Sequence, residues 1–319
     1  MCQIISILIT FSMAISSPDM TMAEKLGYKP TDKLLIIHAD DIGMCHSVNY
    51  ATVSAFKQEM VTCGSIMVPC PWFPEFAAYY RENPGLDVGI HLTTTSEWKY
   101  YRWGPVASKD KVPSLLDSEG FLWRSTDEFS QHAKAEEVEI ELRAQIERAL
   151  QFGIKPTHLD THMGTVFAKP EFLEIYLRLA KEYNITPMLI KLTPDVINRL
   201  KDMKSSLADK IAEMNLSDTP YLDELVSAGS GQTYEEKKAS YHNALRNLKP
   251  GVNQIIVHLG MDDEELKHIT NGYLARYYDY KVFTDPETKK LIDELGIKLI
   301  GWKDIKAKCW GDSFESRKE

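Results

Sequence analysis

Residues 34–41, with the sequence Leu-Leu-Ile-Ile-His-Ala-Asp-Asp, decide the fold class of this chain. Four consecutive apolar residues bounded by polar ones are typical of a buried strand in the parallel sheet of an α/β protein. Two adjacent carboxylates, Asp40 and Asp41, follow where this strand must end, and their mutual repulsion opposes joint ionisation. A cation beside them would remove that cost, whereas the alternative is that they cap the following helix. This stretch alone supports the two interpretations about equally.

Three further segments repeat this pattern of an apolar run that ends in histidine or aspartate. They are residues 87–93 (DVGIHLT), 156–164 (PTHLDTHMG) and 253–260 (NQIIVHLG). Parallel strands present their carboxyl ends at one face of a barrel or doubly wound sheet, where active sites are built. A lone histidine is more often a satisfied core residue than a ligand, but four such segments together favour one shared metal site. Their histidines are His38, His91, His158, His162 and His258.

Asp41, His91 and His162 form the trio best suited to hold a divalent metal. Two imidazoles and one carboxylate, with positions left open for water and substrate, are a usual ligand set for catalytic zinc and related metals. Asp160 is expected to orient a ligand ring from outside the coordination sphere. Strand alternation would place residues 158, 160 and 162 on one face. His158 is therefore expected beside Asp160, outside the coordination sphere, and stays an alternative third ligand.

Four motifs, in order along the chain, resemble those of the YdjC-type carbohydrate deacetylases, a family that includes the chito-oligosaccharide deacetylases. The resemblance extends over residues 33–302, within an expected domain of residues 30–310. It implies a single-domain α/β fold, an irregular TIM-like (β/α) barrel. The β-α alternation of the sequence favours the same architecture over a sandwich. The motifs are residues 39–43 (ADDIG), Asn49, residues 89–92 (GIHL) and residues 157–162 (THLDTH).

Carried over position by position, the resemblance makes Asp41, His91 and His162 the ligands of a divalent metal, zinc or magnesium. It makes Asp40 the general base, and it makes His258 a candidate acid or substrate contact. The implied reaction is removal of acetyl groups from N-acetylated sugars by a metal-bound water. Two positions depart from the pattern: Met163 begins a Met-Gly-Thr sequence where a further histidine often follows, and Leu259 replaces a proline.

Residues 95–129 interrupt the β-α alternation with an aromatic insertion. Long loops in compact domains are often functional, and aromatic faces pack well against sugar rings. Trp98 and Trp103 are therefore predicted substrate contacts, with Arg102 as a polar anchor. The alternative is a packing or dimer-contact loop. A second irregular stretch is expected at residues 205–232.

Composition limits the remaining function classes. The chain has 319 residues, with 37 Lys and Arg against 46 Asp and Glu, for a net charge of −9. This balance argues against nucleic-acid binding, and no apolar run is long enough for a membrane span. A sugar deacetylase is the leading hypothesis. The others are a metal-dependent hydrolase of another amide or ester, and a carbohydrate-binding protein without turnover.

The amino terminus and the cysteines leave several expectations open. Residues 1–20 resemble a signal peptide without its basic start, which favours export to the periplasm or beyond. An N-terminal packing strand or a misplaced start codon is the alternative, and the protein would then be cytoplasmic. The four cysteines after this segment are compatible with disulfides or with buried thiols. A homodimer is expected only from the frequency of two-fold assemblies.

Overall fold

The computed structural model describes residues 20–194, 196–198, 205–214, 216 and 218–311. The predicted signal segment lies outside these residues, apart from residue 20. The described strands form one parallel sheet in the order β5-β4-β3-β2-β1-β7-β6, with β8 paired to the first half of β1. The strands are β1 (Lys33–Ile42), β2 (Cys63–Ile66), β3 (Val88–Leu92), β4 (His158–Thr161), β5 (Thr186–Pro187), β6 (Glu224–Leu225), β7 (Gly251–Val257) and β8 (Lys298–Leu299).

The two ends of this sheet are joined by a parallel bridge between Ile190 and Leu222. Leu222 N–H donates to the carbonyl of Leu189 at 2.8 Å, and Lys191 N–H donates to the carbonyl of Leu222 at 2.8 Å. The predicted irregular α/β barrel is confirmed, with β8 added beside β1. Leu222 of this bridge and β6 lie within residues 205–232. This stretch, expected to be irregular, also contains the helix α8 (Ser205–Glu213).

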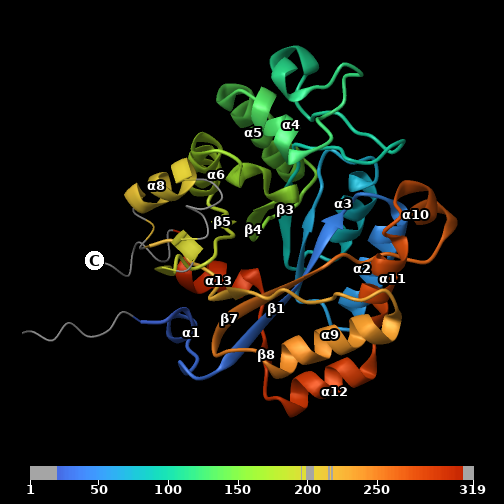
Figure 1. The fold of residues 1–319 in the computed structure, drawn as a ribbon, viewed down its shortest axis with the longest axis vertical. Helices are drawn as coiled ribbons and strands as arrows, with labels where there is room; N and C mark the ends of the chain where they lie inside the picture. The colour runs from blue at the N-terminus through green and yellow to red at the C-terminus, as the bar shows by residue number, and fades with distance from the viewer. Residues whose placement is uncertain (1–19, 195, 199–204, 215, 217, 312–319) are drawn as a thin grey trace, which may run out of the picture.

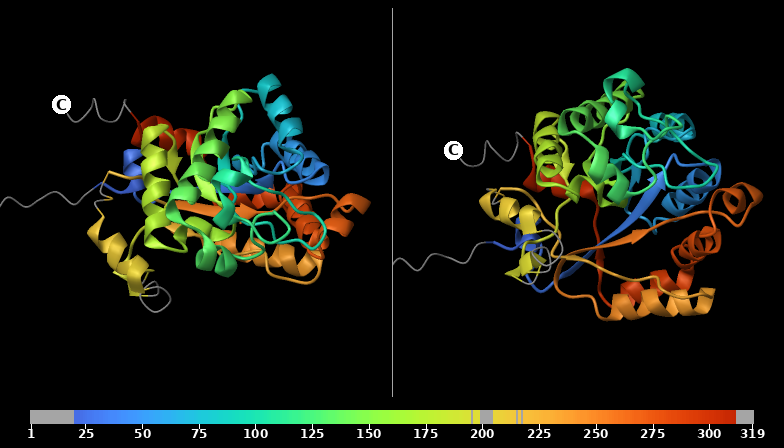
Figure 2. Two further views of the ribbon diagram at one scale, coloured as in Figure 1. Left: turned by 90° about the horizontal axis from the view of Figure 1, so that it is seen from above. Right: turned by 45° about the horizontal axis from the view of Figure 1, so that its top comes forward.

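Helices surround the sheet on its outer side (Figure 1). Figure 2 shows α5 and α6 side by side on one part of this shell, and α9 and α12 together on another. The remaining elements are α1 (Met22–Lys25), α2 (His46–Lys57), α3 (Phe73–Glu82), α4 (Thr126–His132), α5 (Ala135–Gln151), α6 (Pro170–Glu182), α9 (Tyr234–Arg246), α10 (Glu264–Ile269), α11 (Tyr273–Val282), α12 (Pro286–Glu294) and α13 (Trp302–Cys309), with 3₁₀ turns η1 (Lys109–Lys111), η2 (Pro113–Leu115) and η3 (His162–Phe167).

Alternation along β1 divides its side chains between two environments. Leu35 and Ile37 pack outward into a core beneath α2, α9 and α12. Leu34 and Ile36 pack with Trp302 in a separate cluster formed with α1 and α13. His38 follows on the same face as Leu34 and Ile36. The face of β1 that carries Leu34 and Ile36 therefore also carries a polar side chain, His38.

Local signals in the sequence explain where several helices begin. Thr233 starts α9 with a capping box, because its hydroxyl accepts from the Glu236 N–H while the Glu236 carboxylate accepts from the Thr233 N–H. Pro170 stands in the first turn of α6, where its missing N–H costs no hydrogen bond.

The aromatic insertion between β3 and α5 has more regular structure than the sequence indicates. It contains η1, η2 and α4, and isolated bridges pair Thr95 with Trp123 and Leu116 with Leu122. Cys45, Cys63 and Cys70 are buried thiols outside any disulfide. Among the described residues, no helix has the length and apolar character needed to cross a membrane.

Candidate metal centre at the carboxyl ends of the strands

Three predicted ligands, from β1, β3 and the start of η3, meet at the carboxyl end of the sheet. Asp41 Oδ1 lies 3.5 Å from His91 Nε2 and 3.3 Å from His162 Nδ1. The two ring nitrogens are 3.2 Å apart. Asp41 adopts a left-handed backbone conformation, with φ of 64°. Such conformations cost free energy in a non-glycine residue and cluster at functional sites.

This triangle of atoms fits a divalent cation. Ligand atoms about 2.1 Å from a tetrahedral cation lie about 3.4 Å apart, close to the three observed separations. Asp41 Oδ1 is fully buried and has no well-aligned hydrogen-bond donor among the described residues. A buried carboxylate oxygen in this state is costly unless a cation satisfies it. The donor set, two imidazoles and one carboxylate, suits zinc and related metals.

Each ligand imidazole has a carboxylate on its far nitrogen. Asp160 Oδ1 accepts from His91 Nδ1 at 2.9 Å, and Ser65 donates its hydroxyl to the other Asp160 oxygen at 2.8 Å. Glu97 accepts from His162 Nε2 at 3.0 Å. Both bonds place the proton on the far nitrogen and leave a lone pair facing Asp41, which is how a metal ligand is oriented.

Charge around the trio is strongly biased toward holding a cation. Burial opposes ionisation of Asp41, but Arg276, 2.5 Å from its Oδ2, keeps the pKa of that carboxyl well below its usual range. Burial also disfavours protonated His91 and His162. Even so, Asp160 and Asp40 raise the pKa of His91 to about 9, and Asp41 and Glu97 raise that of His162 to about 10. A divalent cation would take the place of those protons.

A cavity of about 470 Å³ opens beside the trio. Asp40 and His258, the predicted base and acid, both line it, and Asp40 Oδ2 lies 3.8 Å from His258 Nε2. The Asp279 carboxylate accepts the backbone N–H of His258 at 3.1 Å. The cavity is therefore bordered by a carboxylate and an imidazole, two groups that can transfer protons.

His158, the alternative third ligand, lies deeper than the trio. Its Nε2 is 2.7 Å from His38 Nε2, and its ring stacks on Trp302 with centroids 5.2 Å apart. Of the histidines in the strand motifs, the structure brings His91 and His162 to Asp41.

The residues predicted to contact substrate take different positions. Arg102 is directed into its own loop, where its guanidinium donates to Asp117 at 2.7 Å and to the carbonyl of Leu122 at 2.8 Å. Trp103 is buried in the core beside the His162 ring. Trp98 is partly exposed, and the guanidinium of Arg276 lies 5.9 Å from its ring centroid. Trp98 therefore neighbours the centre through Arg276, which contacts Asp41, whereas Trp103 neighbours the His162 ring.

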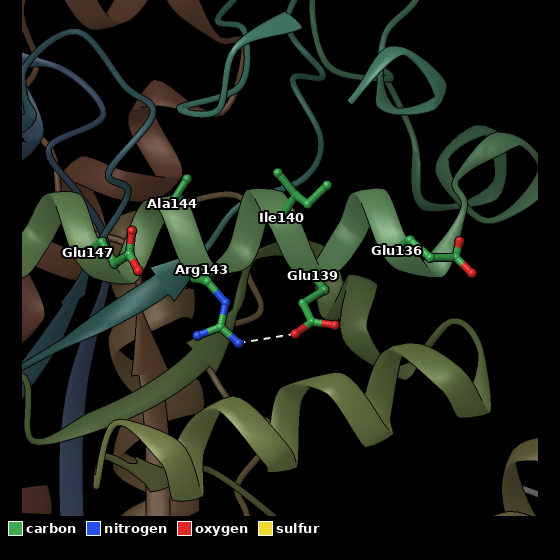
Figure 3. A pocket seen from close by; sticks show the side chains of 6 residues that line it. All are labelled: Glu136, Glu139, Ile140, Arg143, Ala144 and Glu147. Atoms are coloured by element: carbon green, nitrogen blue, oxygen red, sulfur yellow. Dashed lines mark hydrogen bonds and ion pairs between the residues drawn. The ribbon is translucent and has the colours of Figure 1, made fainter. Parts of the chain in front are cut away.

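A hollow of about 460 Å³ along the outer face of α5 has a different character (Figure 3). Two of its polar groups, Glu139 and Arg143, pair with each other and with α6. Arg143 contacts Glu139 at 3.1 Å and also pairs with Glu182. This hollow therefore lacks a set of polar groups that point together at a ligand.

Comparison with known proteins agrees with this geometry. The sequence model of the YdjC-like protein family matches residues 34–294, which is most of the chain. The chain belongs to the YdjC-like family. It is 32% identical over 287 residues to a carbohydrate deacetylase of Thermus thermophilus, covering 90% of this chain and 98% of the relative. It is 41% identical over 274 residues to a carbohydrate deacetylase of Brevibacillus brevis, covering 85% and 99%.

A crystal structure from Enterococcus faecalis shares the fold. That protein, named for cellobiose-phosphate cleavage, superposes with a TM-score of 0.71 at 25% identity, over 86% of this chain and 99% of its own. Two residues of this YdjC-like chain, Met163 and Leu259, depart from the expected motifs. One is exposed and the other is buried. Met163 is 56% exposed and lines the cavity, with φ of 53°. Leu259 is buried in the core.

Sequence reasoning missed Glu97 and Arg276. Glu97 lies in a loop without periodicity, and Arg276 is 235 residues from the aspartate it contacts. Neither has a local motif by which it could have been found.

Proposed function

We propose that this chain is a metal-dependent hydrolase that removes acetyl groups from N-acetylated sugars or their oligomers. The observation that carries the proposal is the triangle of Asp41, His91 and His162, with its unsatisfied carboxylate oxygen, beside a cavity bordered by Asp40. The names of the similar curated proteins support the substrate class.

Hydrolysis of an amide needs a nucleophile, a polarised carbonyl and a proton for the departing amine. When bound by the trio, a divalent cation supplies the Lewis acidity that polarises the carbonyl and acidifies water. Asp40 accepts the proton of the attacking water through its cavity-facing Oδ2. His258 donates a proton to the leaving nitrogen from the opposite wall. The carbon–nitrogen bond breaks, and acetate and the free amine leave.

The first test measures metal stoichiometry by elemental analysis in the parent and in His91→Ala and His162→Ala. His46→Ala is the matched control, because His46 is exposed and pairs with Glu75 away from the trio. We expect tight metal binding in the parent and the control, and its loss in both folded ligand variants. Unchanged metal in the ligand variants would refute the ligand assignment.

The second test measures acetate release from N-acetylglucosamine and its oligomers, beside a panel of other amides and esters. Asp40→Asn should retain metal and lose about 10²–10⁴-fold in turnover, the usual contribution of a positioned base. Turnover confined to non-sugar amides or esters would favour a different hydrolase on this scaffold. Sugar binding without turnover would favour a binding protein.

A further inference from the structure

A row of hydrogen-bonded polar side chains runs through the barrel below the metal centre. His38 of β1 and His158 of β4 are both fully buried, and their Nε2 atoms lie 2.7 Å apart. Barrel interiors are normally filled by branched apolar side chains. Buried imidazoles are costly unless each nitrogen is satisfied. This pair therefore needs a physical reason.

The row of polar side chains continues in both directions from the histidine pair. Toward the amino ends of the strands, His158 Nδ1 lies 2.9 Å from Thr157 Oγ1, and the Thr157 hydroxyl donates to Asp87 Oδ1 at 2.5 Å. Toward the metal centre, His38 Nδ1 lies 2.7 Å from Asp40 Oδ1. Three side chains, Thr157, His158 and His38, thus connect a buried carboxylate, Asp87, to the proposed base, Asp40.

The donors and acceptors can be assigned one by one from Asp87. Thr157 has a single hydroxyl hydrogen, which goes to Asp87, so its oxygen accepts from His158 Nδ1–H. Burial, followed by the charge on His38, holds the pKa of His158 well below its usual value, so this ring is neutral. Its Nε2 then carries a lone pair, and His38 must donate its own Nε2–H to it.

His38 Nδ1 and Asp40 Oδ1 remain, and they face each other. The contact is bent from an ideal hydrogen bond, and neither atom has another hydrogen-bond partner among the described residues. Two lone pairs held 2.7 Å apart in a buried site would repel, so a proton must reside between them. Because Nε2 already carries a hydrogen, a proton on Nδ1 makes His38 a cation.

We propose that His38 is held as an imidazolium beneath Asp40 and positions the general base. This inference rests on the proposed function, since it assumes that Asp40 is the base. His38 anchors Asp40 Oδ1 through its Nδ1, 2.7 Å away. The other oxygen, Oδ2, is left facing the cavity, 3.8 Å from His258 Nε2 and 4.0 Å from His91 Nε2. His38 acts through Asp40 and is a positioning residue.

The charges around His38 agree with this assignment. Burial lowers the pKa of the imidazole, but the Asp40 carboxylate and then Asp160, 3.5 Å from Nε2, outweigh burial and raise it. An imidazolium between two carboxylates in a water-excluded interior is stabilised by both.

A second metal ion is the competing explanation, because His38, Cys63 and His158 also lie close together. The 2.7 Å between the two Nε2 atoms is shorter than the roughly 3.4 Å between two nitrogen ligands of one tetrahedral cation. Burial also raises the pKa of the Cys63 thiol well above its usual value, which disfavours the thiolate that a metal requires. The separation instead fits a hydrogen bond.

The decisive measurement is ¹⁵N NMR of the zinc-loaded chain with labelled histidine, because the shifts report which ring nitrogens carry a proton. Resonances are assigned with His38→Asn and His158→Asn. At neutral pH we expect both nitrogens of His38 to be protonated and only Nδ1 of His158. Asp40→Asn should leave His38 with one protonated nitrogen. A neutral His38 in the parent, or a second zinc per chain, would overturn the proposal.

Steady-state kinetics then separates positioning from folding. His38→Leu should lower kcat by about 10²-fold, with KM nearly unchanged and one zinc retained. His38→Asn, whose amide can still donate to Asp40, should recover part of that loss. His46→Leu is the exposed control and should match the parent. Unchanged kcat in folded His38→Leu would contradict the positioning role.

Acetate release with a neutral His38 would refute only this inference. An inactive parent with a doubly protonated His38 would refute the role of Asp40 as base and, with it, the positioning role.

Discussion

Single residues at the candidate metal centre act in pairs, a predicted ligand and a partner behind it. His91 is backed by Asp160 and His162 by Glu97, and Asp41 is backed by Arg276. The backing groups set which nitrogen carries the proton and where the lone pair points. They are therefore expected to affect metal affinity without touching the substrate.

Glu97→Ala should weaken metal binding by about 10–100-fold, the usual effect of losing the partner of a ligand imidazole. Glu119→Ala is the matched control, because Glu119 lies in the same insertion and pairs with Arg124 instead. Titration with zinc against a competing chelator measures both. Equal affinities in the two variants would show that Glu97 does not orient His162.

The aromatic insertion is the element whose structure departs most from its sequence-based interpretation. Its polar groups are directed inward: Arg102 is paired with Asp117, and the Glu141 carboxylate of α5 accepts the backbone N–H groups of Val106 and Ala107 at 2.9 Å. The Glu141 contacts tie the insertion to α5. The same insertion supplies Glu97, which accepts from His162 of the candidate metal centre.

Arg102→Ala should destabilise the fold by about 1.5–3 kcal/mol, because it removes the buried guanidinium that donates to the Asp117 carboxylate and to the carbonyl of Leu122. Denaturant unfolding measures the loss. KM for the sugar should change little in variants that stay folded. The predicted role as a substrate anchor requires the opposite result, a raised KM with stability unchanged.

Glu141 gives stability a defined pH dependence. Burial raises the pKa of this carboxyl from 4.5 to about 7, against the lowering effect of its N–H donors. Between these values the folded chain holds a proton that the unfolded chain has lost, so this contribution to stability falls as pH rises. The loss is on the order of 3 kcal/mol. Glu141→Gln should remove this dependence of the free energy of unfolding on pH. If that free energy varies with pH equally in parent and variant, Glu141 is not its source.

At the scale of the whole molecule, barrel closure depends on close approach between neighbouring strands. A Cβ on Gly64 of β2 would stand 2.6 Å from Ile42 Cδ1 and 2.7 Å from the carbonyl oxygen of Ala39. Since Asp40 and Asp41 lie between these two β1 residues, the spacing of β1 and β2 bears directly on the candidate metal centre.

Gly64→Ala should therefore lower the free energy of unfolding by about 1–3 kcal/mol, as overpacking usually does. It should also weaken metal binding. Gly85→Ala is the control, because a Cβ there meets no atom within 4 Å. Thermal unfolding compares the two variants, and equal stability would show that β1 and β2 separate without cost.

Much of the fold and part of the site could be predicted from local patterns. The apolar run of β1, the capping box of α9 and the histidines at the strand ends are contained in short windows of sequence, where periodicity and turn chemistry act. The predicted ligands Asp41, His91 and His162 do converge, because parallel strands align their carboxyl ends.

The amino-acid sequence by itself determined the α/β class, the order of the elements and which side chains stand at the strand ends. Only the tertiary structure decided which groups pair behind them: Glu97 with His162, Arg276 with Asp41, and His38 with His158. The same is true of the bridge at Leu222 that joins the two ends of the sheet. The physical reason is that these contacts join residues 32 to 235 positions apart. The partner of a buried polar side chain is set by how the strands close around it, and its neighbours along the chain do not determine that.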